Sequence, residues 1–453
     1  MKLGTDLTQG SVAKKYVFFL IPIILSGIIQ QLYNTADTMV VGMFAGDTAL
    51  AAVGSTSSLT NLILHLFLGL SVGTNVVCAR LFGADNKDGL QKAIHSSILL
   101  ALVSGIFLAF IGYLYSRPLL KLLGTPSDVI DGATLYMQVI FLGSPASMLY
   151  NFGAAILRAA GDTKRPLYIL ISAGLVNVGL NLVCVIGFKM GVLGVALGTI
   201  ASQIFSAIAV LWILLHTESE FKLFLRKLRF HTRELGRIAS TGIPSGLNGI
   251  MFSLSNVIIQ SAINSFGKAA IAGSAAAANI EAYGFLLLSA AEQGLVSFVG
   301  QNMGARKYNR VSSVTKTALV IAFISSFLFL LGIKMYGETL IGLFTDNNSR
   351  TEVIKMGIIK LEIVAGSYIL LIPNQVLNGV LKGMGRAVVP TVINAFCVCA
   401  LRMLWMFTAY PLNPTLNMVY TAYPISWAAS SVAISIAYII IQRKMFKSRK
   451  IEQ

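Results

Sequence analysis

The sequence predicts an all-α integral membrane protein with twelve transmembrane helices in two six-helix lobes. Of its 453 residues, 55% are hydrophobic and 12% are charged, whereas a soluble domain carries roughly 25% charged residues. Twelve apolar segments reach the roughly 20 residues that a helix needs to cross a bilayer. Similar residues also recur at a nearly constant spacing in the two halves. These observations exclude a disordered chain and leave no room for a large water-exposed domain.

Each predicted span is an apolar run of membrane length between polar or charged residues. The first run follows Lys14 and Lys15, as the apolar core of a signal peptide would. It is too long for such a core and has no small-residue cleavage site, so we keep it as a span. The predicted spans are residues 16–41, 50–76, 93–115, 134–157, 166–188, 191–215, 238–263, 271–299, 313–336, 356–381, 388–410 and 419–441.

The distribution of Lys and Arg predicts the orientation, because these residues accumulate in cytoplasmic loops. With the N-terminus inside, the inner segments hold 26 of the 35 basic residues, the outer loops hold eight, and Arg402 lies within a span. We therefore expect a multi-pass protein of the cell (plasma) membrane with both termini in the cytoplasm. The same asymmetry explains the net charge of +17 without any nucleic acid. The basic run 222–237 also suits contact with anionic lipid headgroups.

The two halves carry matched residues at offsets of 221 to 224 positions. Each half has six spans, so both begin on the same side, and the predicted pseudo-two-fold axis runs along the membrane normal. Such repeats are typical of secondary transporters that bind substrate between the halves. We predict an N-terminal lobe at 1–215, a cytoplasmic linker at 216–237 and a C-terminal lobe at 238–453. The matched residues are Pro22, Gly27, Asn34, Gly73, Gly83, Ala84, Leu157, Gly161 and Pro166 with Pro244, Gly249, Asn256, Gly294, Gly304, Ala305, Leu381, Gly385 and Pro390.

A carboxylate within a span marks a candidate ion site, because an ionisable group in a bilayer is costly. Asp37 lies about 6 Å from the outer end of span one at 1.5 Å per residue. Asn177 and Asn181 share one face of span five, and Thr199 on span six lies at a similar depth, about 12 Å. Such oxygen ligands suit Na⁺, and a desolvated Asp also suits a proton. Alternatively, the Asn and Thr side chains only hydrogen-bond between helices.

Four motifs of the chain resemble the MATE (multidrug and toxic compound extrusion) family. They read Gln-Gln-Leu-Tyr-Asn-Thr-Ala-Asp-Thr at 30–38, Leu-Arg-Ala-Ala-Gly-Asp-Thr-Lys-Arg-Pro at 157–166, Gly-Val-Ala-Leu-Gly-Thr at 194–199 and Gln-Asn-Met-Gly-Ala at 301–305. The resemblance covers the whole chain, including span count and repeat. It implies a cation or proton site in the N-terminal lobe at Asp37, Asn177, Asn181 and Thr199. It also implies that Pro22 is a bending point linked to the protonation of Asp37, with a static kink as the alternative.

The chain departs from the family pattern at two places. Some members carry Asp where this chain has Asn181, which leaves the choice between Na⁺ and H⁺ open. Others carry a Glu on span seven, where this chain reads Gly-Ile-Met-Phe-Ser at 249–253, so no second cation site of that type is expected. Glu281, Glu292 and Arg402 are buried charges that either line the substrate cavity, with Arg402 as an ion-pair partner, or form a structural pair. The predicted cavity residues are Gln31, Tyr33, Asn34, Glu281, Glu292 and Arg402.

The sequence therefore predicts a secondary active antiporter that exports organic, cationic or amphipathic compounds in exchange for Na⁺ or H⁺. No phosphate-binding G-x-x-x-x-G-K-[ST] loop or H-E-x-x-H motif is present, so we expect no enzyme and no cofactor beyond the coupling ion. The expected partners are small organic substrates and membrane lipids, without nucleic acid, and the expected state is a monomer. The alternatives are a flippase for a lipid-linked oligosaccharide or lipid precursor, from the same superfamily, and a receptor or scaffold.

Overall fold

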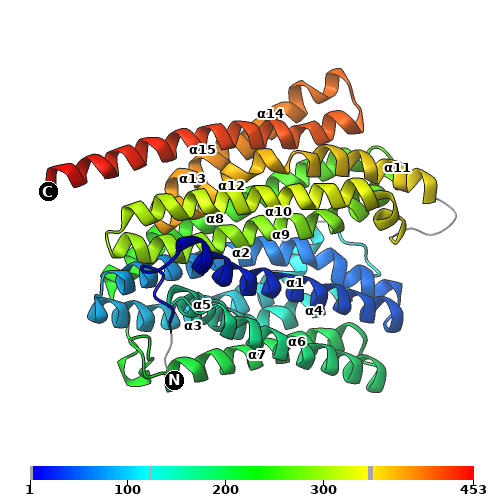
Figure 1. The fold of residues 1–453 in the computed structure, drawn as a ribbon. Coiled ribbons are helices and arrows are strands. Elements are labelled where there is room, and N and C mark those ends of the chain that lie inside the picture. Colours follow the sequence, from blue (N-terminus) through cyan, green and yellow to red (C-terminus); the bar gives the residue numbers. More distant parts are fainter. Residues whose placement is uncertain (1–3, 123, 345–349, 453) are drawn as a thin grey trace. The chain divides into compact units, whose positions relative to one another are not determined.

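The computed structural model describes residues 4–122, 124–344 and 350–452, and the regular secondary structure in these ranges is entirely helical (Figure 1). Ten helices are long and apolar enough to cross a membrane, and two bent helix pairs raise the number of candidate spans in the described residues to twelve. This confirms the predicted all-helical membrane fold. Each predicted span overlaps one of these segments. The non-helical residues within the predicted spans lie at the two bends, at Gly143 and Ser367, or near span ends, at Phe188 and Ala409.

Many helices extend well past the roughly 20 residues that a bilayer requires, and α2 and α9 have 37 residues each. The elements in chain order are α1 (Val12–Phe44), α2 (Asp47–Gly83), α3 (Lys87–Leu122), α4 (Ile130–Leu142), α5 (Ser144–Ala159), α6 (Lys164–Leu182), η1 (Val183–Gly187), α7 (Gly191–His216), η2 (Leu225–Lys227), α8 (Thr232–Asn264), α9 (Lys268–Gly304), α10 (Tyr308–Gly342), α11 (Arg350–Lys360), η3 (Leu361–Ala365), α12 (Tyr368–Gly383), α13 (Val388–Asn394), η4 (Ala395–Ala400), α14 (Leu401–Thr408), η5 (Tyr410–Leu412) and α15 (Leu416–Glu452).

The two bent spans lie at equivalent positions of the repeat. The axes of α4 and α5 differ by 47° at Gly143, and the axis of α12 differs by 49° from that of the helix ending at Ala365. Gly366 follows that helix and lies 223 positions after Gly143, within the range of 221 to 224 found between the two halves. Pro145 lies in the first turn of α5, where its missing N–H leaves no helical bond unmade. The internal repeat is therefore visible in backbone geometry as well as in sequence.

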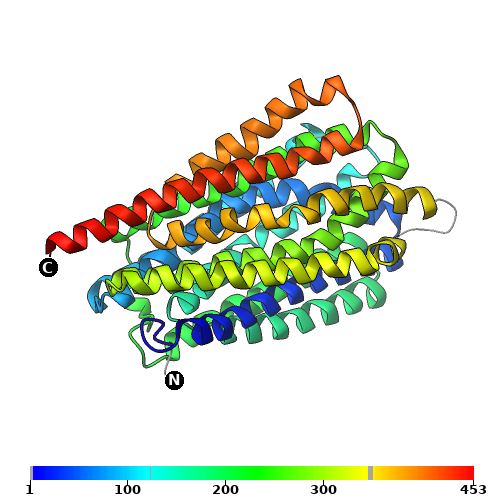
Figure 2. The same ribbon diagram turned by 45° about the horizontal axis from the view of Figure 1, so that its top comes forward.

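The chain forms two compact units. The first contains residues 4–10, 17–246 and 300–306, and the second contains residues 11–16, 247–299 and the described residues from 307 onward. Helices α8 and α9 each contribute to both units. Within the second unit, α15 packs against α12 and α14 (Figures 1 and 2). The division into lobes at a 216–237 linker stays a prediction.

Several segments that were predicted to lie on the cytoplasmic side meet at one end of the first unit. The N-terminal segment contacts the α5–α6 loop, where the Thr5 amide donates a hydrogen bond to the Ala160 carbonyl. Gln301 joins both, because its Oε1 accepts from the Leu7 amide at 2.9 Å and its Nε2 donates to Ala159 O at 2.8 Å. These segments therefore share one end of the unit, while the side of the membrane that this end faces stays a prediction.

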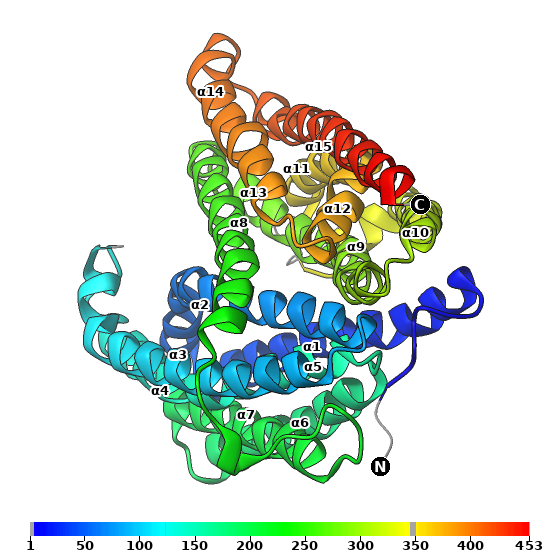
Figure 3. The same cartoon turned by 90° about the vertical axis from the view of Figure 1, so that its left-hand side faces the viewer.

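The linker between α7 and α8 is docked on the start of α3 (Figure 3). Gln91 Nε2 donates to the backbone oxygens of Glu220 and Lys222 at 2.6 and 3.1 Å. The His95 ring lies against Phe224, and Ser96 Oγ accepts from the His231 amide at 3.0 Å. Side chains of one helix thus satisfy the linker backbone, and the linker is an ordered part of the first unit.

Glycines allow α2 and the first half of α8 to cross at close range. A Cβ added to Gly69 would lie 2.2 Å from the backbone N of Gly246, and one added to Gly73 would lie 2.2 Å from Ile238 O. Gly242 and Gly246 face α2 in the same way. Both helices carry the G-x-x-x-G spacing that lets membrane helices approach closely. This spacing is visible in the sequence, although we predicted no close crossing from it.

Candidate functional site

The four predicted ion-site residues come together within the first unit, on α1, α6 and α7. Asn181 Nδ2 donates to Asp37 Oδ1 at 2.5 Å and lies 3.4 Å from Asn177 Oδ1. Asn177 Nδ2 lies 3.5 Å from Thr199 Oγ1, which donates to the Val195 carbonyl at 3.0 Å. A single chain of polar contacts therefore joins the carboxylate of α1 to the backbone of α7.

The amide of Asn181 presents its N–H, and not its oxygen, to the carboxylate. Its Oδ1 accepts no hydrogen bond from the described residues and lies against Gly198 of α7. A Cβ added to Gly198 would stand 2.0 Å from this oxygen. Gly198 is therefore required for the side chain of Asn181 to reach Asp37. Asn181 is completely buried and Asn177 is 4% exposed, so the donors are screened from solvent.

Apolar side chains surround this cluster. Val40 and Val41 of α1 pack with Val185 and Val195, which follow Asn181 and precede Thr199 in the chain. Tyr136 of α4 packs against the same valines and interacts electrostatically with Asp37. We did not predict Tyr136 as a site residue; the only available signal was a tyrosine within span four. Its position adds a phenol to the groups near the carboxylate.

The three predicted cavity residues of α1 differ in their exposure and in their contacts. The Tyr33 hydroxyl donates to Ile171 O of α6 at 3.1 Å, and its ring covers Gly174. Asn34 is exposed, whereas Gln31 is half-buried. Pro22 lies inside the continuous helix α1, where Ser26 Oγ donates to its carbonyl at 2.7 Å. The roles of these residues in substrate binding and bending stay predictions.

The partly buried acids of α9 pair with lysines, and the suggested ion pair with Arg402 is wrong. Lys382 Nζ lies 2.7 Å from Glu292 Oε1, and Lys360 Nζ lies 3.4 Å from Glu281 Oε2. We counted both lysines among the loop charges, but Lys382 is 6% exposed and Lys360 is 7% exposed, and both lie in the bent helix pair that ends at Gly383. Their long side chains reach the acids of α9 because charged groups inside a bilayer are stabilised by pairing.

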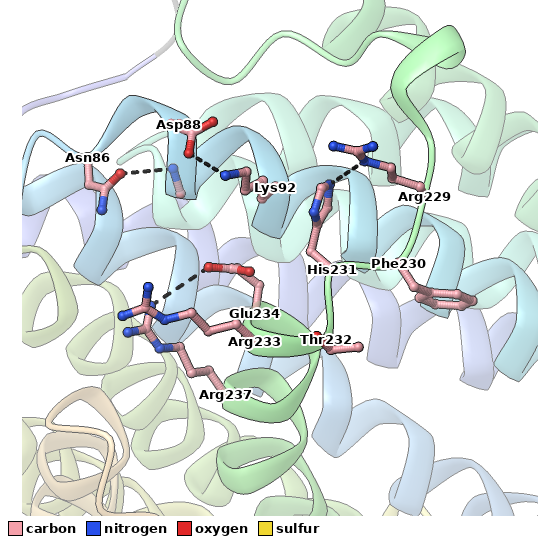
Figure 4. A pocket seen from close by; sticks show the side chains of 11 residues that line it. Asn86, Asp88, Lys92, Arg229, Phe230, His231, Thr232, Arg233, Glu234 and Arg237 are labelled. Atoms are coloured by element: carbon pink, nitrogen blue, oxygen red, sulfur yellow. Dashed lines mark hydrogen bonds and ion pairs between the residues drawn. The ribbon is translucent and has the colours of Figure 1, made fainter.

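A second polar site lies between the linker and the start of α3. This pocket of about 460 Å³ is lined by acidic, basic and neutral side chains (Figure 4). The lining residues are Asn86, Asp88, Gly89, Lys92, Arg229, Phe230, His231, Thr232, Arg233, Glu234 and Arg237. Lys92 pairs with Asp88 at 2.5 Å. Arg229 Nε lies 3.4 Å from His231 Nε2, and burial together with Arg229 lowers the pKa of His231 below its usual 6.5. A neutral His231 can accept this hydrogen bond, so the linker favours the unprotonated imidazole.

Among the described residues, no group of three or more His, Cys, Asp or Glu side chains could hold a metal ion. The family model MatE matches residues 22–183 and 244–408, which make up more than half of the chain. The chain belongs to the MATE family. The two matched ranges begin at Pro22 and Pro244, the first pair of repeat-related residues. This MATE protein is therefore a membrane transporter and not an enzyme.

Two bacterial relatives resemble this MATE transporter over most of their length. The probable multidrug resistance protein YoeA of Bacillus subtilis (strain 168) is 26% identical over 98% of this chain and 97% of its own. YpnP of the same organism, also a probable multidrug resistance protein, is 31% identical over 89% of each chain. An outward-facing multidrug resistance MATE structure superposes with a TM-score of 0.92 at 22% identity, covering 99% of this chain and all of its own, and shows the same fold.

Proposed function

We propose that this MATE transporter is a secondary active multidrug antiporter that exports organic, cationic or amphipathic compounds in exchange for Na⁺ or H⁺. The observation that carries the proposal is the carboxylate of Asp37, held 2.5 Å from the amide of Asn181 in an apolar part of the first unit. The multidrug resistance relatives YoeA and YpnP support the class of substrate. Partners are small organic molecules and membrane lipids, and the transporter acts as a monomer.

Coupling follows from a difference in affinity between two states. A ligand shifts a conformational equilibrium only by the difference in its affinity for the two conformations. The coupling ion binds at Asp37 and neutralises its charge, which changes the interactions of α1 with α6 and α7. The substrate favours the opposite conformation, in which Asp37 is free of its ion. Each ligand therefore drives the release of the other.

The side chains around Asp37 serve different roles in this mechanism. Asn181 donates to the ion-free carboxylate and stabilises its charge, because hydrogen bonds to charged groups are stronger than those between neutral groups. Asn177 and Thr199 extend the polar chain to α7 and offer oxygen atoms to a cation. A single carboxylate suits one monovalent ion per cycle, either Na⁺ or H⁺.

We also propose an orientation for the first unit. The N-terminal segment, the α5–α6 loop and the linker form one end of this unit, and this end lies on the cytoplasmic side of the plasma membrane. The excess of Lys and Arg in these segments supports this side. A cysteine at Ser219 in the linker should be protected from an impermeant thiol reagent added outside intact cells. A cysteine at Asn413, between α14 and α15, should react, and the reverse pattern would refute this orientation.

A flippase would need several uncompensated cations to hold a pyrophosphate, whereas Lys360 and Lys382 are each paired with a glutamate. The two functions are separated by transport in vesicles reconstituted with purified protein. Export of a cationic dye should depend on a Na⁺ or H⁺ gradient, imposed separately to identify the ion. Movement of lipid-linked sugar without gradient-driven dye export would contradict the antiporter.

A further inference from the structure

Arg402 occupies an unusual environment in the second unit. Its side chain is 2% exposed, although it lies in the middle of span eleven. Nε donates to Ser426 Oγ at 2.9 Å, and Nη1 lies 3.3 Å from both Ser255 Oγ and Asn256 Oδ1. The guanidinium carbon lies 4.3 Å from the centre of the Tyr423 ring. These partners come from α8 and α15, so the guanidinium joins three helices.

Among the described residues, no acid forms a salt bridge with Arg402. In the part of the chain that the structure describes, its partners are two hydroxyls, one amide oxygen and the faces of Tyr423 and Trp427. The partly buried Glu281 and Glu292 of α9 are instead paired with lysines. Hydroxyl and amide oxygens with an aromatic face form the kind of cage that binds organic cations.

The internal repeat relates this cage to the Asp37 cluster. Helices α8, α14 and α15 of the second unit correspond to α1, α6 and α7 of the first. At the offset of 222, Asn256 corresponds to Asn34, one helical turn before Asp37. At the offset of 224, Arg402 falls on position 178, between Asn177 and Asn181, and Tyr423 corresponds to Thr199. A positive side chain therefore takes the place that the first unit provides for an ion.

We propose that the second unit is a self-occupied cation site, in which the Arg402 guanidinium permanently fills the counterpart of the Asp37 cluster. The proposal rests on the proposed antiport function and specifies its stoichiometry. A second cation placed about 6 Å from Arg402 would bind about 100-fold more weakly, taking an effective dielectric constant of 20. The second unit therefore takes up no coupling ion, and the exchangeable ion binds at Asp37 alone.

The first test counts coupling ions. Equilibrium binding of Na⁺, or proton uptake if the ion is H⁺, should give one ion per purified wild-type chain and none for Asp37→Asn. An ion that remains bound in Asp37→Asn, in protein whose wild type shows gradient-driven export, would overturn the self-occupied site but leave the antiport function standing. Absence of gradient-driven export in the wild type would instead contradict the proposed function.

The second test asks whether the cage requires a cation. Arg402→Ala should lower the thermal unfolding midpoint of the full chain, and methylguanidinium at millimolar concentration should restore it. Methylurea, a neutral molecule of similar shape that keeps some of the N–H donors, should bind at least about 30-fold more weakly because it lacks the desolvated cation–aromatic contact. Methylguanidinium should also restore the unfolding midpoint of the double variant Arg402→Ala/Asp37→Asn, because this rescue does not depend on transport.

Equal rescue by methylguanidinium and methylurea would show that the cage needs only hydrogen-bond donors, and would overturn the proposal. If Arg402→Ala does not fold, Arg402→Lys and Arg402→Met provide the comparison. Arg402→Lys retains a charge, so its unfolding midpoint should lie above that of Arg402→Met, which has similar length without charge. A more stable Arg402→Met would contradict a site that requires a positive group.

Discussion

Replacing Gly198 by alanine should perturb the ion site without removing any polar atom. The new Cβ would stand 2.0 Å from Asn181 Oδ1, so the Asn181 side chain must move by roughly 1 Å or more to restore van der Waals contact. That shift breaks its 2.5 Å hydrogen bond to Asp37. A hydrogen bond to a charged group contributes about 1.5–3 kcal/mol. This energy corresponds to about a 10- to 150-fold change in ion affinity.

The direction of this change follows from the orientation of the amide. Asn181 donates to the ion-free carboxylate, so its displacement destabilises that state and Gly198→Ala should bind the coupling ion more tightly. The assay is the ion concentration at half-maximal binding to purified protein. Gly179→Ala is the control, because no atom lies within 4 Å of its added Cβ. Unchanged affinity in Gly198→Ala, or a weaker one, would refute the donor role of Asn181.

Three further outcomes are expected. Gly246→Ala should lower the free energy of unfolding by about 1–3 kcal/mol, because its Cβ would lie 2.4 Å from a backbone oxygen of α2. Gly236→Ala is the control, because no atom lies within 4 Å of its added Cβ, and an equal loss in both variants would contradict the tight crossing. Glu292→Gln should cost about 3–5 kcal/mol by leaving Lys382 unpaired, and the double variant with Lys382→Met should recover much of it by chemical denaturation. Because the pKa of His231 is lowered in the docked linker, docking should weaken as the pH falls below about 6.5; hydrogen exchange of the linker should show this, and the same pH dependence in His231→Gln would contradict it.

The candidate spans and the proximity of Asp37, Asn177, Asn181 and Thr199 could be predicted because both depend on local sequence. Apolar length alone marks a span, so each predicted span falls on a helix even where the helix continues further. The four-residue spacing of Asn177 and Asn181 places them on one face of α6, and depth brings them near Asp37. The resemblance to the MATE family pointed to the same residues and is supported by the family match.

The contacts across the fold could not be predicted from local patterns. The orientation of Asn181 depends on Gly198, which lies on a neighbouring helix, and Tyr136 approaches Asp37 from span four. Lys360 and Lys382 were assigned to loops because lysine is costly in a bilayer, yet each finds a glutamate on α9. These pairings follow from how the helices are aligned with one another, which neither residue type nor spacing reveals.

Ion-gradient-driven efflux by wild type and Asp37→Asn in reconstituted vesicles tests the central claim most directly. The substitution keeps the shape of the side chain and removes its charge, so the protein should fold and insert normally. We predict rapid export of a cationic dye by the wild type when the coupling-ion gradient is imposed, and no gradient-driven export by Asp37→Asn at equal protein content. Export at the wild-type rate in Asp37→Asn would contradict the assignment of Asp37 as the coupling residue.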